Sequence, residues 1–228
     1  TIQQAIDISG LGDTLIALPG TYIENINFNG KDIVLGSLFL TNNDSTYIEE
    51  TIINGNQTDR VVTFENEEPN SGELVGFTIQ NGSGGIFINN SSPVIRNNTI
   101  CYNTTIGDNY YNGGGILIEG GKPSIVNNII HSNSANGNNN NGDGGGIYLG
   151  TDDMSLLRGN KIINNYGRTS GGIYVQSFES KIQNNIIANN TAHYNHTYAG
   201  GGIKISGSSY KGHCNIINNT IVNNSQKV

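Results

Sequence analysis

The chain reads PVIRNNTICYN at residues 93–103, and four later segments repeat this pattern in fixed register: PSIVNNIIHSN (123–133), SLLRGNKIINN (155–165), SKIQNNIIANN (180–190) and CNIINNTIVNN (214–224). A glycine-led stretch precedes each of them: GGIFI from 84, GGGILI from 113, GGGIYL from 144, SGGIYV from 170 and GGGIKI from 200. A unit this short cannot bury an apolar face by itself, so consecutive copies have to share one core. The repeats therefore predict a solenoid.

Two columns of the repeat are apolar in every copy. They are Ile95, Ile125, Leu157, Ile182 and Ile216, and then Ile100, Ile130, Ile162, Ile187 and Ile221. Because branched aliphatic side chains stack well inside a sheet, we expect both columns to line the core.

A third column holds asparagine in every copy, at Asn98, Asn128, Asn160, Asn185 and Asn219. The residue before it is Asn in four copies and Gly159 in the other, an exchange that is typical of a turn with positive φ. Another asparagine column follows at Asn103, Asn133, Asn165, Asn190 and Asn224. We expect both columns to form ladders of amide hydrogen bonds at two corners of a coil.

Each repeat thus supplies a glycine-led strand and two further short strands, with a period of 25 to 34 residues and no helical periodicity. This pattern predicts an all-β fold, a right-handed parallel β-helix with three strands per coil. The less regular N-terminal third follows the same plan, with strands expected within 12–20, 24–28 and 31–37, and then within 50–56, 60–65 and 73–82. About seven coils are expected in total.

The first residues, TIQQAIDI, place Ile2, Ala5 and Ile6 on one helical face, which suits a short helix that caps the open end of the core. We therefore expect one domain over residues 1–228, and we expect it to be part of a longer chain. The expected divisions are a cap at 1–9, irregular coils at 12–82 and regular coils at 84–228.

Charge and hydropathy argue against two classes of partner. The formal net charge is −7, and only 11 Lys and Arg residues are scattered over the chain, whereas nucleic-acid binding needs clustered cations. The sequence also contains no apolar run of 18 residues, so we expect no membrane insertion by this segment.

The segments TIQQAID at 1–7 and GDTLIALPGTYIENINFNGKDIVLGS at 12–37, together with the GGGIYL and NNxI units, resemble the right-handed parallel β-helix superfamily with the pectin-lyase-like fold. The GGGI and NNxI spelling is also similar to repeats of polymorphic outer-membrane autotransporters. The resemblance implies an extracellular protein, secreted or on the cell surface. It leaves the activity open, because the superfamily includes lyases, hydrolases, epimerases, adhesins and stalks.

The middle position of each glycine-led strand points outward, because side chains alternate along a strand. This outward column consists of Phe87, Leu117, Tyr148, Tyr174 and Lys204. One aromatic or aliphatic side chain per coil predicts a carbohydrate-binding platform on which sugar rings stack. The alternative is ordinary cross-strand packing on an exposed face.

Loops of variable length enter the glycine-led strands and would wall the same face. Arg168 and Tyr111 are the loop residues that we assign to the carbohydrate site. Other candidates in these loops are Tyr110, Asp143, His193, His196 and Tyr198. The alternative is that the loops are solvated insertions at one corner.

For a lyase, the resemblance implies acidic residues that bind Ca²⁺ and a basic residue that abstracts a proton, whereas hydrolases need paired carboxylates. The acidic candidates are Asp152, Asp153, Glu119 and Asp143, and the basic ones are Lys204 and Arg168. No acidic column repeats, and His193 with His196 lack further metal-ligand partners. We therefore assign no catalytic residue, no metal site and no cofactor, and Ca²⁺ enters only with the lyase alternative.

The leading hypothesis is a noncatalytic secreted or cell-surface β-helix module, a structural or adhesive scaffold. Its expected partners are a polysaccharide or cell-surface glycan, or further copies stacked end to end in a filament. The alternative is a polysaccharide lyase or glycoside hydrolase that acts on a uronic-acid polysaccharide.

Overall fold

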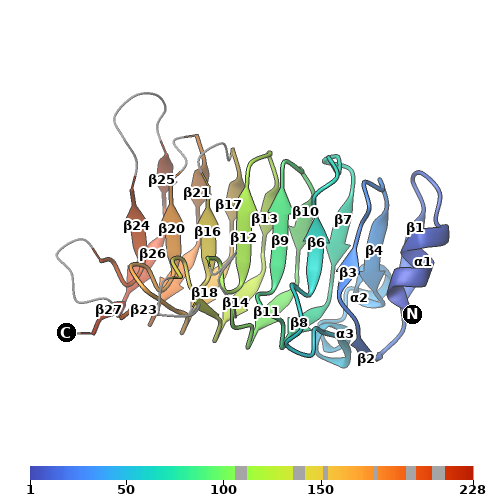
Figure 1. The fold of residues 1–228 in the computed structure, drawn as a ribbon, viewed down its shortest axis with the longest axis horizontal. Coiled ribbons are helices and arrows are strands. Elements are labelled where there is room, and N and C mark those ends of the chain that lie inside the picture. The colour runs from blue at the N-terminus through green and yellow to red at the C-terminus, as the bar shows by residue number, and fades with distance from the viewer. Residues whose placement is uncertain are drawn as a thin grey trace.

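The computed structural model describes residues 1–105, 112–135, 142–150, 154–176, 179–193, 199–206 and 214–227. Their strands stack along one elongated axis, with the two termini at opposite ends (Figure 1). Each turn of the chain adds one strand to each of three parallel sheets. The fold is therefore a right-handed parallel β-helix, as the repeats predict.

Neighbouring strands in every sheet come from consecutive turns of the chain. Sheet A contains β1 (Thr14–Ala17), β4 (Val34–Ser37), β7 (Glu73–Val75), β10 (Val94–Arg96), β13 (Ser124–Val126), β17 (Leu156–Arg158), β21 (Lys181–Gln183) and β25 (Asn215–Ile217). Sheet B contains β2 (Gly20–Ile23), β5 (Thr51–Asn54), β8 (Thr78–Gln80), β11 (Thr99–Cys101), β14 (Ile129–His131), β18 (Lys161–Ile163), β22 (Ile186–Ala188) and β26 (Thr220–Val222).

Sheet C holds the glycine-led strands, which Figure 1 shows side by side in chain order. It contains β3 (Ile26–Asn27), β6 (Val62–Phe64), β9 (Ile86–Asn89), β12 (Ile116–Glu119), β16 (Ile147–Leu149), β20 (Ile173–Val175) and β24 (Ile203–Ile205). The chain passes through sheets A, B and C in turn, which gives seven complete coils, and an eighth begins with β25 and β26.

A fourth, narrow sheet lies between sheets B and C in the later coils and was not expected. Sheet D contains β15 (Ser134–Ala135), β19 (Tyr166–Gly167), β23 (Thr191–Ala192) and β27 (Ser225–Gln226). In three of these strands the second residue is a small one that is fully buried or lies against backbone, namely Ala135, Gly167 and Ala192. Small side chains let the backbone turn closely against the core at this corner.

The N-terminal third divides into strands differently from the expectation. Residues 12–20 contain β1 and the first residue of β2, because the chain bends at Pro19. Residues 73–82 contain both β7 and β8, because Gly76 between them adopts a φ of 80°. The strand within 31–37 is β4, which opens the second coil and does not close the first.

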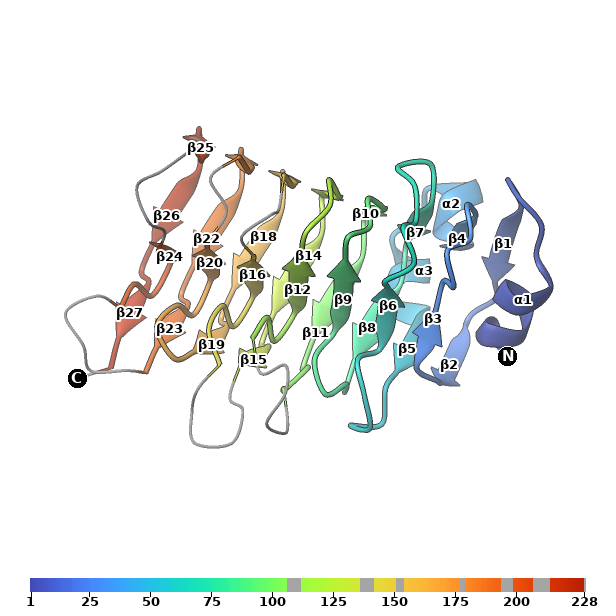
Figure 2. The ribbon, with the colours of Figure 1, turned by 45° about the horizontal axis from the view of Figure 1, so that its top comes forward.

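The expected cap is present as α1 (Ile2–Ile8), and Ile2 and Ile6 are buried on the end of the core. Two short helices that the repeats did not predict, α2 (Phe39–Asn42) and α3 (Thr46–Glu50), fill the connection between β4 and β5 (Figure 2). None of the helices formed by the described residues has the length and apolar character that crossing a membrane requires.

The two apolar columns line the core, as predicted. Ile95, Ile125, Leu157 and Ile182 in sheet A, and Ile100, Ile130, Ile162 and Ile187 in sheet B, are all 0% exposed. Only their last members differ, because Ile216 is 37% and Ile221 is 47% exposed in the eighth coil. Consecutive coils therefore share one core, as expected for a repeat that is too short to bury an apolar face by itself.

Both asparagine ladders are present and run through the later coils. In the first ladder each amide Nδ2 donates to the Oδ1 of the next asparagine, over 3.2, 3.1, 3.0 and 2.9 Å from Asn98 to Asn219. The second ladder repeats this from Asn103 to Asn224 over 3.0, 3.1, 3.0 and 2.9 Å.

The residue before each asparagine of the first ladder adopts a left-handed conformation, as the Asn and Gly exchange predicts. The φ angles are 55° at Asn97, 55° at Asn127, 70° at Gly159, 56° at Asn184 and 52° at Asn218. This column is the corner at which the chain leaves sheet A for sheet B.

Candidate functional site

The predicted outward column is continuous on sheet C. The strand register pairs Phe87 with Leu117, Leu117 with Tyr148, Tyr148 with Tyr174, and Tyr174 with Lys204. Five consecutive coils thus bring one side chain each to a single line on the outer face of the sheet. The structure therefore assembles the residues that the alternation grouped.

The side chains at the centre of the outward column are less exposed than expected. Leu117 is 0%, Tyr148 8% and Tyr174 6% exposed, and these three form a second apolar cluster outside the main core. Phe87 packs against this cluster and, like Lys204, is only partly exposed. An open platform for sugar rings is therefore absent at the three central positions.

Stacking within the column occupies the faces of its rings. The rings of Tyr148 and Tyr174 lie 5.1 Å apart between centroids with an interplanar angle of 3°. Lys204 lies on the rung that follows Tyr174, and its Nζ is 5.4 Å from the centroid of the Tyr174 ring. A face that contacts the neighbouring rung cannot also stack on a sugar, so a ligand would meet ring edges.

The hydroxyl of Tyr148 is committed to the protein. It donates to Gln176 Oε1 at 2.8 Å, one coil further along. Burial raises the pKa of this phenol strongly, and the nearby Tyr174, Asp143 and Glu119 raise it further. Tyr148 is therefore a protonated hydrogen-bond donor at neutral pH and not a base.

Polar residues lie beside the outward column, two residues further along the chain, in four of its five coils, and Gly150 occupies this position after β16. We call these four residues the polar row. Asn89 and Glu119 pair in register, and Gln176 and Ser206 follow Val175 and Ile205 on the later coils. Glu119 is exposed and the other polar members are partly exposed. Their side chains share the outer face because strand positions two apart point the same way.

Asp143 and Arg168 lie at the corner before the glycine-led strands. The Oδ1 atom of Asp143 accepts hydrogen bonds from the amide and the hydroxyl of Thr169, at 3.0 and 2.7 Å. The amide of Arg168 donates to the carbonyl of Gly142 at 2.7 Å. Both contacts join the fifth coil to the sixth, so this carboxylate holds a corner together.

Several predicted site residues lie outside the described residues. They are Tyr111, which was assigned to the carbohydrate site, and Tyr110, Asp152, Asp153, His196 and Tyr198. Among the residues that the structure does describe, no group of three His, Cys, Asp or Glu side chains is placed to hold a metal ion.

Arg60 is a buried cation near this face that the repeats gave no reason to single out. It is 6% exposed, and its guanidinium donates to the carbonyls of Gly113 and Asn112 at 2.6 and 2.8 Å. Burial lowers its pKa to about 10, an effect that Asp59 and Glu119 oppose. The side chain thereby ties the second coil to the fourth across Gly84, where any side chain would collide with the guanidinium.

The described histidines pack against aromatic rings. His193 stacks on Tyr166 with centroids 4.7 Å apart and an angle of 9°, and its Nδ1 lies 3.0 Å from the carbonyl of Gly167. That contact requires a proton on Nδ1, and among the described residues the buried Nε2 has no hydrogen-bond partner. His131 meets Tyr102 edge on, and burial lowers its pKa.

The known proteins that the chain resembles include a solved structure and a protein family. One solved structure that resembles the chain is the alginate lyase from Paenibacillus sp. str. FPU-7, with 12% sequence identity and a TM-score of 0.48. The match covers 99% of this chain and 94% of that one. No relative is found among curated proteins. The family described as the right-handed β-helix region matches residues 68–227, and the chain belongs to that family.

Proposed function

We propose that this chain is a noncatalytic β-helix scaffold of a secreted or cell-surface protein. The observation that carries the proposal is the use of polar and aromatic side chains for coil-to-coil contact. The ladders, the Tyr148 and Tyr174 stack, and the Asp143 corner all join one coil to the next. Groups bound to each other in this way hold a rigid rod together and are not available for proton transfer.

An activity assay tests the noncatalytic part of this proposal. The protein is incubated with a panel of uronic-acid polysaccharides, and unsaturated products and new reducing ends are measured. We expect neither product. Product formation that Lys204→Ala abolishes and Lys122→Ala preserves would establish the lyase or hydrolase alternative, because Lys122 is an exposed lysine outside the outward column.

We further propose that a glycan, where one binds, contacts the polar row and the ends of the outward column. Phe87 and Lys204 keep part of their surface exposed, and Glu119 is open to solvent. Retardation of the protein in gels that contain polysaccharide should fall in Phe87→Ala and Lys204→Ala but not in Lys122→Ala. Equal mobility in all gels would remove the glycan from the proposal and leave the scaffold.

Self-association through the eighth coil is a second candidate, which its exposed core columns favour. Ile216 and Ile221 are 37% and 47% exposed there. Sedimentation at rising protein concentration should show association that Ile221→Lys abolishes, while Ile129→Lys on the side of sheet B leaves it intact. A protein that stays monomeric at the highest concentration contradicts this candidate.

A further inference from the structure

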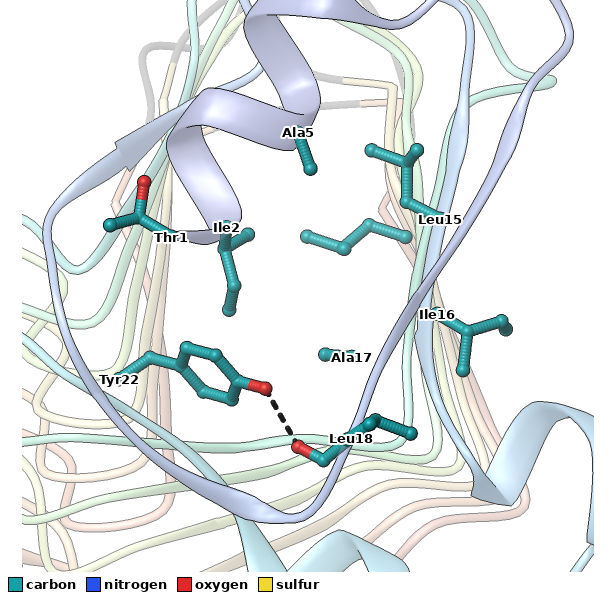
Figure 3. A pocket seen from close by; sticks show the side chains of 9 residues that line it. Thr1, Ile2, Ala5, Leu15, Ile16, Ala17, Leu18 and Tyr22 are labelled. Atoms are coloured by element: carbon teal, nitrogen blue, oxygen red, sulfur yellow. Dashed lines mark hydrogen bonds between the residues drawn. The ribbon is translucent and has the colours of Figure 1, made fainter.

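A cavity of about 260 Å³ lies at the N-terminal end of the β-helix, between α1 and the first coil. Figure 3 shows that α1 covers only one side of this end, and that side chains from α1, β1 and β2 surround a hollow. Its lining consists of Thr1, Ile2, Ala5, Leu15, Ile16, Ala17, Leu18, Tyr22 and Leu35. The cavity is thus the uncovered part of the main core.

The lining offers a ligand almost no polar group. The hydroxyl of Tyr22 donates to the carbonyl of Leu18 at 2.8 Å, so both of these atoms already have a partner (Figure 3). The hydroxyl oxygen of Thr1 accepts the amide of Gln4 at 3.1 Å in the helix cap. None of the lining side chains carries a charge. A ligand that needs a salt bridge or several hydrogen bonds finds neither here.

The walls of the cavity are held in place by contacts away from its interior. Glu24 accepts the amides of Ile2 and Gln3 at 2.9 and 3.0 Å, which fixes the start of α1. Lys31 Nζ donates to the carbonyl of Asp7 at 2.8 Å, which fixes its last turn. These hydrogen bonds anchor both ends of α1 beside the cavity.

We propose that this cavity binds a small, neutral, apolar molecule. An enclosed apolar cavity of roughly 150 Å³ accepts benzene, and this one, which is open on one side, has the larger volume of about 260 Å³. Ligand sites in proteins are typically concave and apolar with few polar groups. Water gains little here because the free polar partners that it needs are missing. The site is independent of the scaffold role, which does not require it.

Toluene is the probe for this proposal, and methyl NMR is the measurement. Toluene should shift the methyl signals of Ile2, Leu15 and Leu35 and leave those of Ile187 unchanged, and it should raise the melting temperature. Ala5→Leu places a larger side chain in the cavity and should weaken toluene binding by at least about tenfold. Ile8→Ala on the same helix should bind normally, because Ile8 is 88% exposed and does not line the cavity.

Two comparisons keep the outcome decisive if Ala5→Leu folds poorly. Tyr22→Phe should retain toluene binding, because the hydroxyl is directed to Leu18. Benzoate should bind much more weakly than toluene, because no lining side chain carries a charge and the ammonium of Thr1 already donates to Gln4 Oε1. The proposal is overturned if toluene leaves the cavity methyl signals unmoved, or if benzoate binds as well as toluene. It is also overturned if those signals shift with protein concentration alone, which would mean that a second copy fills the space.

Discussion

At the residue scale, each buried ladder asparagine makes hydrogen bonds within three consecutive coils. Asn160 donates from Nδ2 to the carbonyl of Ile125 at 2.8 Å and to Oδ1 of Asn185 at 3.0 Å. Its Oδ1 accepts the backbone amide of Asn128 at 2.9 Å. All of these groups are buried, so no water replaces a lost partner. A side chain without both a donor and an acceptor would leave some of these buried groups without a partner.

Replacing Asn160 with alanine should lower the free energy of unfolding by about 2–5 kcal/mol, because several buried groups lose their partners. Asn219→Ala is the matched control in the same ladder and should cost about 1 kcal/mol or less, because Asn219 is partly exposed and water can substitute. Urea unfolding of both variants checks this. Equal losses of unfolding free energy in the two variants would mean that a buried ladder position stabilises the protein no more than a partly exposed one.

Cys101 should be an unreactive thiol in the folded protein. It is 3% exposed, and burial raises its pKa to about 11 from 9.0. In a Cys214→Ser background, iodoacetamide at pH 8 should modify it about 100-fold more slowly than in urea, in proportion to the smaller thiolate fraction. The neutral thiol is favoured by folding, so its contribution to stability is complete below pH 9 and is lost as the pH rises through 11. Rapid modification of the native protein would contradict the burial.

At the element scale, the regular coils follow from the repeat, whereas the N-terminal coils follow it only in part. The ladder columns are occupied there by Phe77 and Gly82, whose amides donate to Asn98 and Asn103, both at 2.9 Å. Because neither residue is an asparagine, each ladder ends here. The asparagine columns that identify the corners are therefore missing from the N-terminal coils. The division of residues 73–82 into two strands was therefore not recognisable from the repeat alone.

The cap depends on Glu24, which binds two amides at the start of α1. Glu24→Ala should destabilise α1 by about 1–2 kcal/mol, because it removes an acceptor and a negative charge from a helix N-terminus. Hydrogen exchange of the α1 amides should then accelerate, while the ladder amides stay protected. Glu50→Ala removes an exposed carboxylate elsewhere and should change neither. Unchanged exchange in α1 would show that core packing alone holds the cap.

At the scale of the whole molecule, the strands of each coil pair only with those of the neighbouring coils, whereas the side chain of Arg60 reaches from the second coil to the fourth. The order of strands in sheets A, B and C follows the chain order without exception. Stability in such a stack is a sum of coil and interface contributions, so an end coil is supported on one side only. This difference between inner and outer coils is visible in the exposure of Ile221 against the burial of Ile162.

Ile162→Ala should therefore destabilise the protein by about 2–5 kcal/mol, through lost apolar contact and a cavity. Ile221→Ala occupies the same column in the eighth coil and should cost about 1 kcal/mol, because its side chain is already 47% exposed. Urea unfolding compares the two. A larger effect of Ile221→Ala would mean that the eighth coil has a partner in solution.

The direction of the outward column could be predicted from sequence, but its burial could not. Alternation states that the side chain of Tyr148 leaves the core, and the structure agrees. Exposure depends in addition on the flat stack with Tyr174 and on the hydrogen bond to Gln176, which arise from side chains on the next coil. The buried Arg60 was missed for a similar reason, because its partners are backbone carbonyls that leave no mark in the sequence.

The hydrogen bonds that link the asparagines of both ladders all point in the same direction along the axis of the β-helix. Backbone and side-chain donors of each asparagine point to the oxygen of the following one, so all links have the same polarity. The last described coil ends this series with the backbone amides of Asn219 and Asn224, whose Nδ2 groups already donate to the carbonyls of Ile182, Ile217 and Ile187. A partner that meets these amides has to present acceptors. Two such ends turned toward each other would set donor against donor, so the ladders select for a partner that continues the coil in the same direction.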